Sequence, residues 1–150
     1  MTKLDPTDRK ILRYLEHDAR ISNAELAKSV GLSASACLRR VQELEKRNII
    51  LGYRTVLDRT VMGGGLNVMV LVGLAQHRKE DQQAFEAAMR DAKEVRECHN
   101  VAGNIEYLLR VEVADLDSYK RFHTDVLGTV KQVNSIVSHI VMASPKDCRA

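Results

Sequence analysis

The chain has 150 residues, of which 45% are hydrophobic and 29% are charged, and its formal net charge is +3. This length suits one large domain or two small ones, and halves of about 60 to 80 residues would be marginal alone and gain from oligomerisation. The polar first ten residues argue against a secretory signal, and the longest apolar stretch, Val68–Val72, is too short to cross a bilayer. Three widely spaced cysteines without a CxxC pair argue against a disulfide framework and a zinc thiolate site, and they favour a reducing cytoplasm.

Positive charge is concentrated at the front of the chain. The first 60 residues contain 12 Lys or Arg and 8 Asp or Glu, whereas the remaining residues contain 11 and 12. A basic block of this kind indicates a polyanion as partner.

Three short helices, each with its own start signal, are predicted before residue 50. Residues 4–16 form the first, with Asp5 as its N-cap. A capping box that begins at Ser22 opens the second helix, and Gly31 ends it because glycine readily adopts the left-handed conformation. The third helix begins near Ser33. The positions expected to face a common core are Ile11, Leu12, Leu15, Leu26, Ala27, Val30, Cys37, Val41 and Leu44.

The second and third helices have the spacing of a helix-turn-helix. Ala27, Gly31 and Cys37 place a small residue, a turn glycine and a small buried residue where two helices cross closely. The third helix would enter the major groove with its N-terminal end toward the bases. The residues predicted to contact bases or phosphates are Ser22, Asn23, Ser33, Ala34, Ser35, Arg39, Arg40, Lys46, Arg47 and Arg54. The alternative is a helical hairpin with a solvated, charged face.

A β-prone run and a polar, glycine-rich stretch follow the helices. The run Ile49–Leu57 is expected to form a small wing, or a strand that pairs with another copy of the chain. The predicted organisation is a helix-turn-helix DNA-binding domain over residues 1–57, a linker over 58–65, a sensing and oligomerisation domain over 66–143 and a tail over 144–150.

The periodicity changes after the linker. Strands are expected over 66–75, 95–101, 105–113 and 132–142, and helices over 80–92 and 115–127. The order β-α-β-β-α-β is the ferredoxin-like arrangement, so the whole chain is predicted to be an α+β protein with an N-terminal, winged helix-turn-helix. Both helices then cover one face of an antiparallel sheet, and the bare, apolar second face predicts a symmetric dimer.

Few residues favour an enzyme, although the ferredoxin-like module hosts many chemistries. Cys98 and His99 are neighbours, but adjacent strand residues point to opposite faces and cannot easily form a nucleophile–base pair. The five histidines show no ligand spacing, so no metal site is expected. No base, nucleophile and oxyanion donor are recognisable together.

Two sets of motifs point to a known family. The first motif, RISNAELA, begins at Arg20 and continues through VGLS and CLRRV. The second is ECH, VAG and YLLR, between Glu97 and Arg110. With these motifs the chain resembles the Lrp/AsnC family of feast/famine regulators. The resemblance covers about residues 4–143. It implies dimers that join through the C-terminal sheets and often form octamers, and amino acids bound in clefts between dimers. The effector-binding residues it implies are Val101, Ala102, Gly103, Asn104, Ile105, Glu106 and His139.

Two departures separate this sequence from the family pattern. Where the family usually has G-D-x-D-Y, Asn104 replaces one aspartate and the longer Glu106 replaces the other. A carboxylate at this turn could pair with the ammonium group of an effector. The third helix also begins Ser33-Ala34-Ser35-Ala36, without the proline often found there.

The expected function is therefore a cytoplasmic, nucleoid-associated regulator that binds double-stranded DNA and itself. Its assembly or DNA affinity is expected to respond to a small effector, an amino acid, with no other cofactor. The alternative is an effector-independent architectural protein of the same fold that wraps DNA.

Overall fold

Two units with separate hydrophobic cores make up the chain in the computed structural model, which describes residues 4–58, 61–62 and 65–146. The units are Met1–Thr55 and Val56–Ala150. The predicted linker 58–65 and tail 144–150 lie partly outside the described residues. No helix in the described part of the chain is both long and apolar enough to span a membrane.

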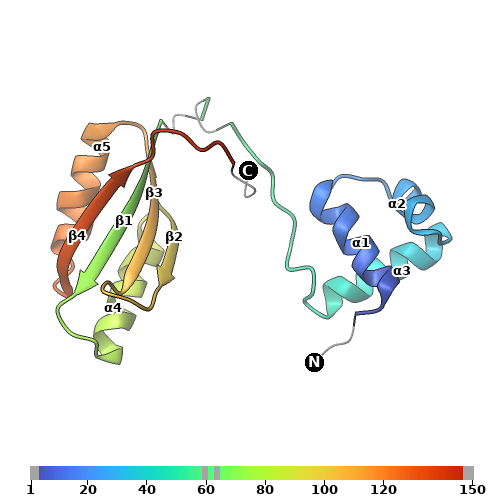
Figure 1. The fold of residues 1–150 in the computed structure, drawn as a ribbon, viewed down its shortest axis with the longest axis horizontal. Helices are drawn as coiled ribbons and strands as arrows, with labels where there is room; N and C mark the ends of the chain where they lie inside the picture. The colour runs from blue at the N-terminus through green and yellow to red at the C-terminus, as the bar shows by residue number, and fades with distance from the viewer. Residues whose placement is uncertain (1–3, 59–60, 63–64, 147–150) are drawn as a thin grey trace. The chain divides into compact units, whose positions relative to one another are not determined.

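The first unit contains three helices that begin where their caps were predicted. They are α1 (Pro6–His17), α2 (Asn23–Val30) and α3 (Ala34–Lys46) (Figure 1). The side chains of Asp5, Ser22 and Ser33 each accept a hydrogen bond from a backbone N–H in the first turn that follows. Gly31 ends α2 with a φ of 75°, which confirms the predicted left-handed turn.

The core of this unit consists of the predicted inward positions. Ile11, Leu26, Ala27, Cys37 and Leu44 are buried, and the remaining predicted positions pack around them half-buried. Desolvation raises the pKa of the Cys37 thiol, so this cysteine behaves as a small core residue. Ala27 of α2 and Cys37 of α3 therefore belong to one shared core, as a helix-turn-helix requires.

The β-prone run after α3 forms no strand within the chain. Residues 49–58 are all described, yet none belongs to a strand, and Leu51 and Val56 are 88% and 59% exposed. An isolated strand leaves its backbone groups unpaired, and no second β-prone segment in this unit can pair with the run. Pairing with another copy stays a prediction.

The second unit has the predicted β-α-β-β-α-β order. Its elements are β1 (Leu66–Leu74), α4 (Lys79–Asp91), β2 (Val95–Asn100), β3 (Tyr107–Val113), α5 (Leu116–Arg121) and β4 (Val133–Ile140). The strands form one antiparallel sheet in the order β2-β3-β1-β4 (Figure 1). Both central strands therefore have neighbours on each side, and the edges belong to β2 and β4.

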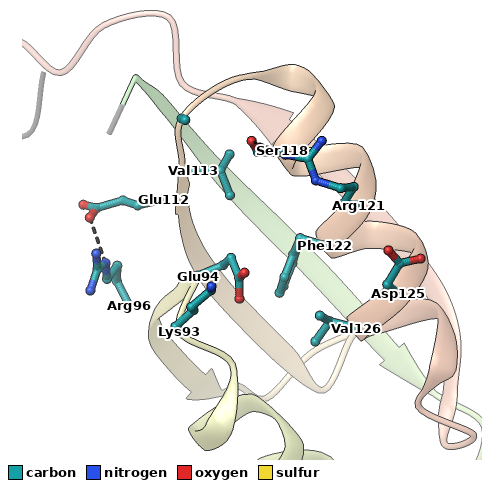
Figure 2. Close-up of a pocket in the computed structure, with 11 residues that line it drawn as sticks. Lys93, Glu94, Arg96, Glu112, Val113, Ser118, Arg121, Phe122, Asp125 and Val126 are labelled. Atoms are coloured by element: carbon teal, nitrogen blue, oxygen red, sulfur yellow. Dashed lines mark hydrogen bonds and ion pairs between the residues drawn. The ribbon is translucent and has the colours of Figure 1, made fainter. Parts of the chain in front are cut away.

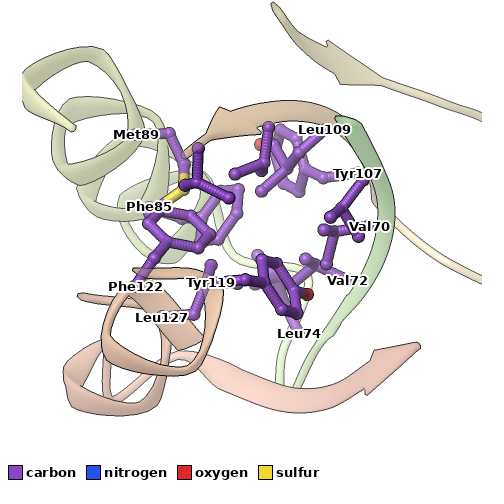
Figure 3. Packing of buried hydrophobic residues seen from close by; sticks show 13 residues of the cluster. Val70, Val72, Leu74, Phe85, Met89, Tyr107, Leu109, Tyr119, Phe122 and Leu127 are labelled. Atoms are coloured by element: carbon purple, nitrogen blue, oxygen red, sulfur yellow. The ribbon is translucent and has the colours of Figure 1, made fainter. Parts of the chain in front are cut away.

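Both helices pack on one face of this sheet. Alternate residues of β1 and β3 are buried against aromatic and aliphatic side chains of α4 and α5 (Figure 3). The largest fully buried members of this core are Tyr107, Phe85, Met89, Leu109 and Leu127. The predicted single-sided cover of the sheet is confirmed.

The last helix differs from its prediction. It ends at Arg121 and continues as a π turn, Phe122–Val126, and a short 3₁₀ turn. The wider turn shifts the phase of the helix, so Leu127, five residues after Phe122, is also fully buried. Leu116 is 62% exposed, because it is the first helical residue after the Asp115 cap.

Candidate DNA-binding and effector surfaces

The exposed side of α3 carries the side chains best placed to meet DNA. Ser35, Arg39 and Lys46 are all exposed and lie on the side opposite the buried Cys37 and Leu44. Neither Arg39 nor Lys46 forms an ion pair with any residue in the part of the chain that the structure describes. Their charges are therefore available to phosphates or base edges.

Other predicted DNA contacts hold the helix-turn-helix together. The Nδ2 group of Asn23 donates to the carbonyl oxygen of Ala34 at 2.8 Å, which ties the start of α2 to the start of α3. The Ser22 hydroxyl donates to the Glu25 carboxylate at 2.7 Å and accepts from the Glu25 N–H, and these bonds lower the pKa of Glu25. Ser33 caps α3 and is itself exposed. Ala34 is exposed beside it, Arg47 is half-buried at the other end of α3, and Arg54 is exposed beyond it.

Arg40 has partners within the three-helix unit that the sequence did not predict. Its Nη1 group lies 2.6 Å from Asp5 Oδ2 and 2.6 Å from Asp8 Oδ1, so two carboxylates of α1 hold the side chain. These bonds raise the pKa of Arg40, while the Asp8 N–H bond and then Arg40 lower the pKa of Asp5. Arg40 thus braces α3 against α1, and its predicted contact with DNA stays a prediction. Sequence reasoning identified Asp5 only as a cap, because nothing in the sequence pairs residues 32 and 35 positions apart.

The predicted effector turn, residues 101–106, lies between β2 and β3. A backbone bond of 2.9 Å from Val101 N–H to the Glu106 carbonyl closes it. Ala102, Gly103 and Asn104 form the exposed tip, and Ile105 is half-buried. A side chain added at Gly103 would meet no atom of the protein within 4 Å, so the tip offers open space to a ligand.

Glu106 is the best-defined polar group of this region. Its Oε2 atom accepts from the Leu74 N–H at 2.6 Å, its Oε1 atom lies 3.2 Å from His77 Nδ1, and its side chain is 14% exposed. Gly73 lies beside it, where an added Cβ would come within 2.4 Å of Ser135 Oγ. The carboxylate is therefore held by the end of β1. No sequence pattern pointed to His77, because it precedes α4 in a segment without a motif.

His139 is not brought to this turn within one chain. It pairs with Met69, whereas Ser135, which pairs with Gly73 beside Glu106, lies four positions earlier on β4. Four residues of strand span roughly 13 Å. Because the resemblance implies a cleft between dimers, a role for His139 beside residues 101–106 of another copy stays a prediction.

A hollow beside α5 does not resemble a catalytic site. Its volume is about 570 Å³, and it lies between α5 with its π turn and the adjoining parts of β2 and β3 (Figure 2). Lys93, Arg96 and Arg121 line it together with the carboxylates of Glu94, Glu112 and Asp125, and Arg96 is paired with Glu112 at 2.9 Å. Cations and carboxylates alternate around it, without a nucleophile beside a base.

Cys98 is not an activated nucleophile. It lies opposite Leu109 on β3 while His99 lies opposite Leu108, so the two side chains point to opposite faces, as predicted. Desolvation, with a smaller contribution from the Glu86 carboxylate, raises the pKa of the Cys98 thiol to about 11. The thiolate that nucleophilic chemistry needs is therefore scarce at neutral pH.

The second face of the sheet carries an apolar patch beside a charged network. The apolar patch consists of Met69, Leu71, Leu108 and Val137, which are half-buried or exposed. Beside it, Arg110 pairs with Glu97 at 2.8 Å and with Glu112, and Arg96 joins the same Glu112. An apolar patch with a polar border is typical of a protein interface.

Known proteins share both halves of the chain. Residues 4–50 match the family described as winged helix-turn-helix DNA-binding, and residues 67–150 match the Lrp/AsnC ligand binding domain. The chain is 38% identical over 143 residues to the leucine-responsive regulatory protein of Haemophilus influenzae, covering 95% of this chain and 86% of that relative. The Escherichia coli protein of the same name is 37% identical over 143 residues, with 95% and 87% covered.

Solved structures share the fold over nearly the whole chain. A transcriptional regulator of Neisseria meningitidis in complex with L-Met is similar with a TM-score of 0.91 and 32% identity, covering 97% of this chain and 94% of that one. AsnC of Escherichia coli has a TM-score of 0.88 and 25% identity, with 97% of each chain covered. The likeness includes both the three-helix unit and the sheet unit.

Proposed function

The chain belongs to the Lrp/AsnC family of transcriptional regulators, and from this we propose that an amino acid controls its assembly or its affinity for a specific DNA sequence. It is a DNA-binding transcription regulator with a ligand-binding domain and not an enzyme. One observation carries the proposal: a helix-turn-helix with unpaired cations on α3 is joined to a sensor unit whose turn has an open tip. We expect the protein to act on DNA in the nucleoid.

The reading function rests on the free charges of α3. Replacing Arg39 with alanine should lower the affinity for a duplex from the region upstream of its own gene about tenfold, and should reduce the salt slope by about 1 if one phosphate contact is lost. Fluorescence anisotropy at several salt concentrations measures both quantities. Lys79→Ala removes one exposed charge from the other unit and serves as the control. Equal affinities for the two variants would contradict the assignment of α3 as the reading helix.

The sensing function rests on the turn 101–106. The Glu106 carboxylate is fixed by Leu74 and His77, and an effector ammonium group could add to it. The Neisseria relative was solved with L-Met, which supports an amino acid as the class of ligand. His139 could complete such a site only from another copy, which agrees with a cleft between dimers.

Gly103→Thr is expected to abolish any effector response while DNA binding stays within about twofold. The added side chain would occupy the open tip of the turn, where no protein atom lies within 4 Å. The measurement is the mass by light scattering and the DNA affinity, each with and without the twenty amino acids. Loss of DNA binding together with the response would indicate misfolding, and an unchanged response would contradict a site at this turn.

The proposal includes an oligomeric state. Two chains would form a dimer through the apolar sheet face, and dimers would associate into an octamer. Each dimer would read a pseudo-palindromic site with half-sites about one DNA turn apart. The second candidate function is the architectural one, in which DNA wraps around the assembly without an effector. Tight DNA binding that no amino acid alters would favour this candidate.

A further inference from the structure

The side of α1 that faces away from the core is a cationic stripe. Arg9, Lys10, Arg13 and His17 recur at spacings of one, three and four residues, so they share this side of the helix. Tyr14 lies among them and is 37% exposed. A hollow of about 560 Å³ follows the stripe, lined by Pro6, Arg9, Lys10, Arg13, Tyr14 and His17.

The charges of this stripe are not neutralised within the chain. Within the described residues, no side-chain hydrogen bond or ion pair involves Arg9, Lys10 or Arg13, in contrast to Arg40. The helix α1 contains two carboxylates. Asp8 is turned inward to Arg40, so Glu16 is the one exposed carboxylate of this helix. Three unpaired cations on three turns of helix thus create a positive field that the protein does not use for its own stability.

The stripe also points away from α3. The opposite side of α1 contributes buried Ile11 to the core and Asp8 to the brace with Arg40. The exposed side of α3, with Ser35 and Arg39, faces away from the same core. A duplex held against α3 therefore leaves the α1 stripe free for other phosphates.

We propose that the α1 stripe is a second DNA-backbone site, which binds a stretch of duplex other than the one read by α3. Arg9, Lys10 and Arg13 would each contact phosphate oxygens, and the Tyr14 hydroxyl can donate to a phosphate as well. Such contacts carry no sequence information, so the stripe accepts any duplex. This inference rests on the proposed DNA-reading function and adds to it the ability to hold two duplex segments at once.

The test is the capture of a second duplex by protein bound to a first. A biotinylated duplex that carries one binding site is immobilised, full-length protein is bound, and an excess of unlabelled duplex with the same site then occupies the reading helices of the other copies in the assembly. A fluorescent duplex that lacks the site is added at rising salt. The variant is Arg9→Ala/Arg13→Ala, and Lys79→Ala/Lys120→Ala removes the same charge from exposed positions of the other unit. Capture by the stripe variant should fall at least tenfold, with a salt slope lower by about 2, while its affinity for the first duplex changes less than threefold.

Three outcomes are decisive. Unchanged capture would overturn the inference, because the stripe would then be a solvated surface. An equal loss of binding to the first duplex would also overturn it, by placing the stripe in the reading site. If unaltered protein fails to bind the first duplex at all, the proposed function itself fails. A ligation experiment on a long duplex with one binding site shows whether the second stretch can come from the same DNA molecule, because simultaneous binding of both stretches promotes ring closure. The stripe variant should reduce ring closure as well.

Discussion

Arg40→Ala is expected to destabilise the three-helix unit while leaving the salt slope of DNA binding unchanged. The substitution removes the ion-pair partner of Asp8, whose side chain is only 11% exposed. Stranding a nearly buried carboxylate costs several kcal/mol when both groups are fully buried, but Arg40 is 33% exposed, so we expect about 1 to 2 kcal/mol. In a unit of this size that corresponds to a decrease in melting temperature of roughly 5 to 10 °C.

Calorimetry of the full chain, together with binding at several salt concentrations, measures this effect. Arg39→Ala, which removes the neighbouring exposed charge, should leave the melting temperature nearly unchanged and lower the salt slope instead. Asp8→Ala combined with Arg40→Ala should cost less than the sum of the two single changes, because the pair is lost only once. An unchanged melting temperature with a reduced salt slope would show instead that Arg40 contacts DNA phosphates and does not stabilise the three-helix unit.

The same brace makes the unit sensitive to acid. The pKa of Asp5 lies below its ordinary value of 3.8, chiefly because of the Asp8 N–H bond and then because of Arg40. A depressed carboxyl pKa stabilises the folded state at pH values above the unfolded pKa, and the stabilisation is lost as the pH falls through the folded value. The contribution of Asp5 to the free energy of unfolding is therefore complete at neutral pH. It begins to decrease near pH 4, and it is lost as the pH falls through the lower pKa of the folded state.

Leu108→Asp is expected to reduce the assembly to single chains. Leu108 lies in the apolar patch of the bare sheet face, and a symmetric contact would place the new carboxylate on both partners at once. Two desolvated charges in an apolar interface would cost more than the interface can supply. Light scattering measures the mass, and circular dichroism confirms that the sheet is retained.

The matched control is Leu116→Asp, the same change at a leucine that is 62% exposed at the start of α5. This variant should keep the mass of the unaltered protein. If both variants keep that mass, the bare sheet face is not the surface through which copies associate. If both become monomers, the effect of Leu108→Asp is not specific to the sheet face.

Local signals in the sequence were enough for most of the fold. The caps at Asp5, Ser22 and Ser33, and the left-handed Gly31, depend only on residues within one turn of helix. Hydrophobic periodicity placed the strands and helices of the sheet unit because alternation in β1 and β3 follows directly from one buried face.

The parts that the sequence could not predict depend on distant residues. The Arg40 brace joins positions more than 30 residues apart, so an arginine on the reading helix resembled a DNA contact. The π turn at Phe122–Val126 depends on how the helix end packs on the sheet, and it brings Leu127 into the core. The partners of His139 could not be predicted, because the family resemblance describes assemblies, whereas strand register decides which residues meet within one chain.

The separation of the two hydrophobic cores has a consequence for how such a chain can change over evolutionary time. Among residues 4–58, 61–62 and 65–146, no buried side chain of the three-helix unit is a member of the sheet core. Substitutions that repack one core therefore need no compensation in the other, because close packing couples only residues in contact. A lineage could exchange the reading half for a relative's half in a single recombination event near residue 55 and retain its sensor. Chimeras joined at that position should fold, and each half should keep the melting behaviour of its parent.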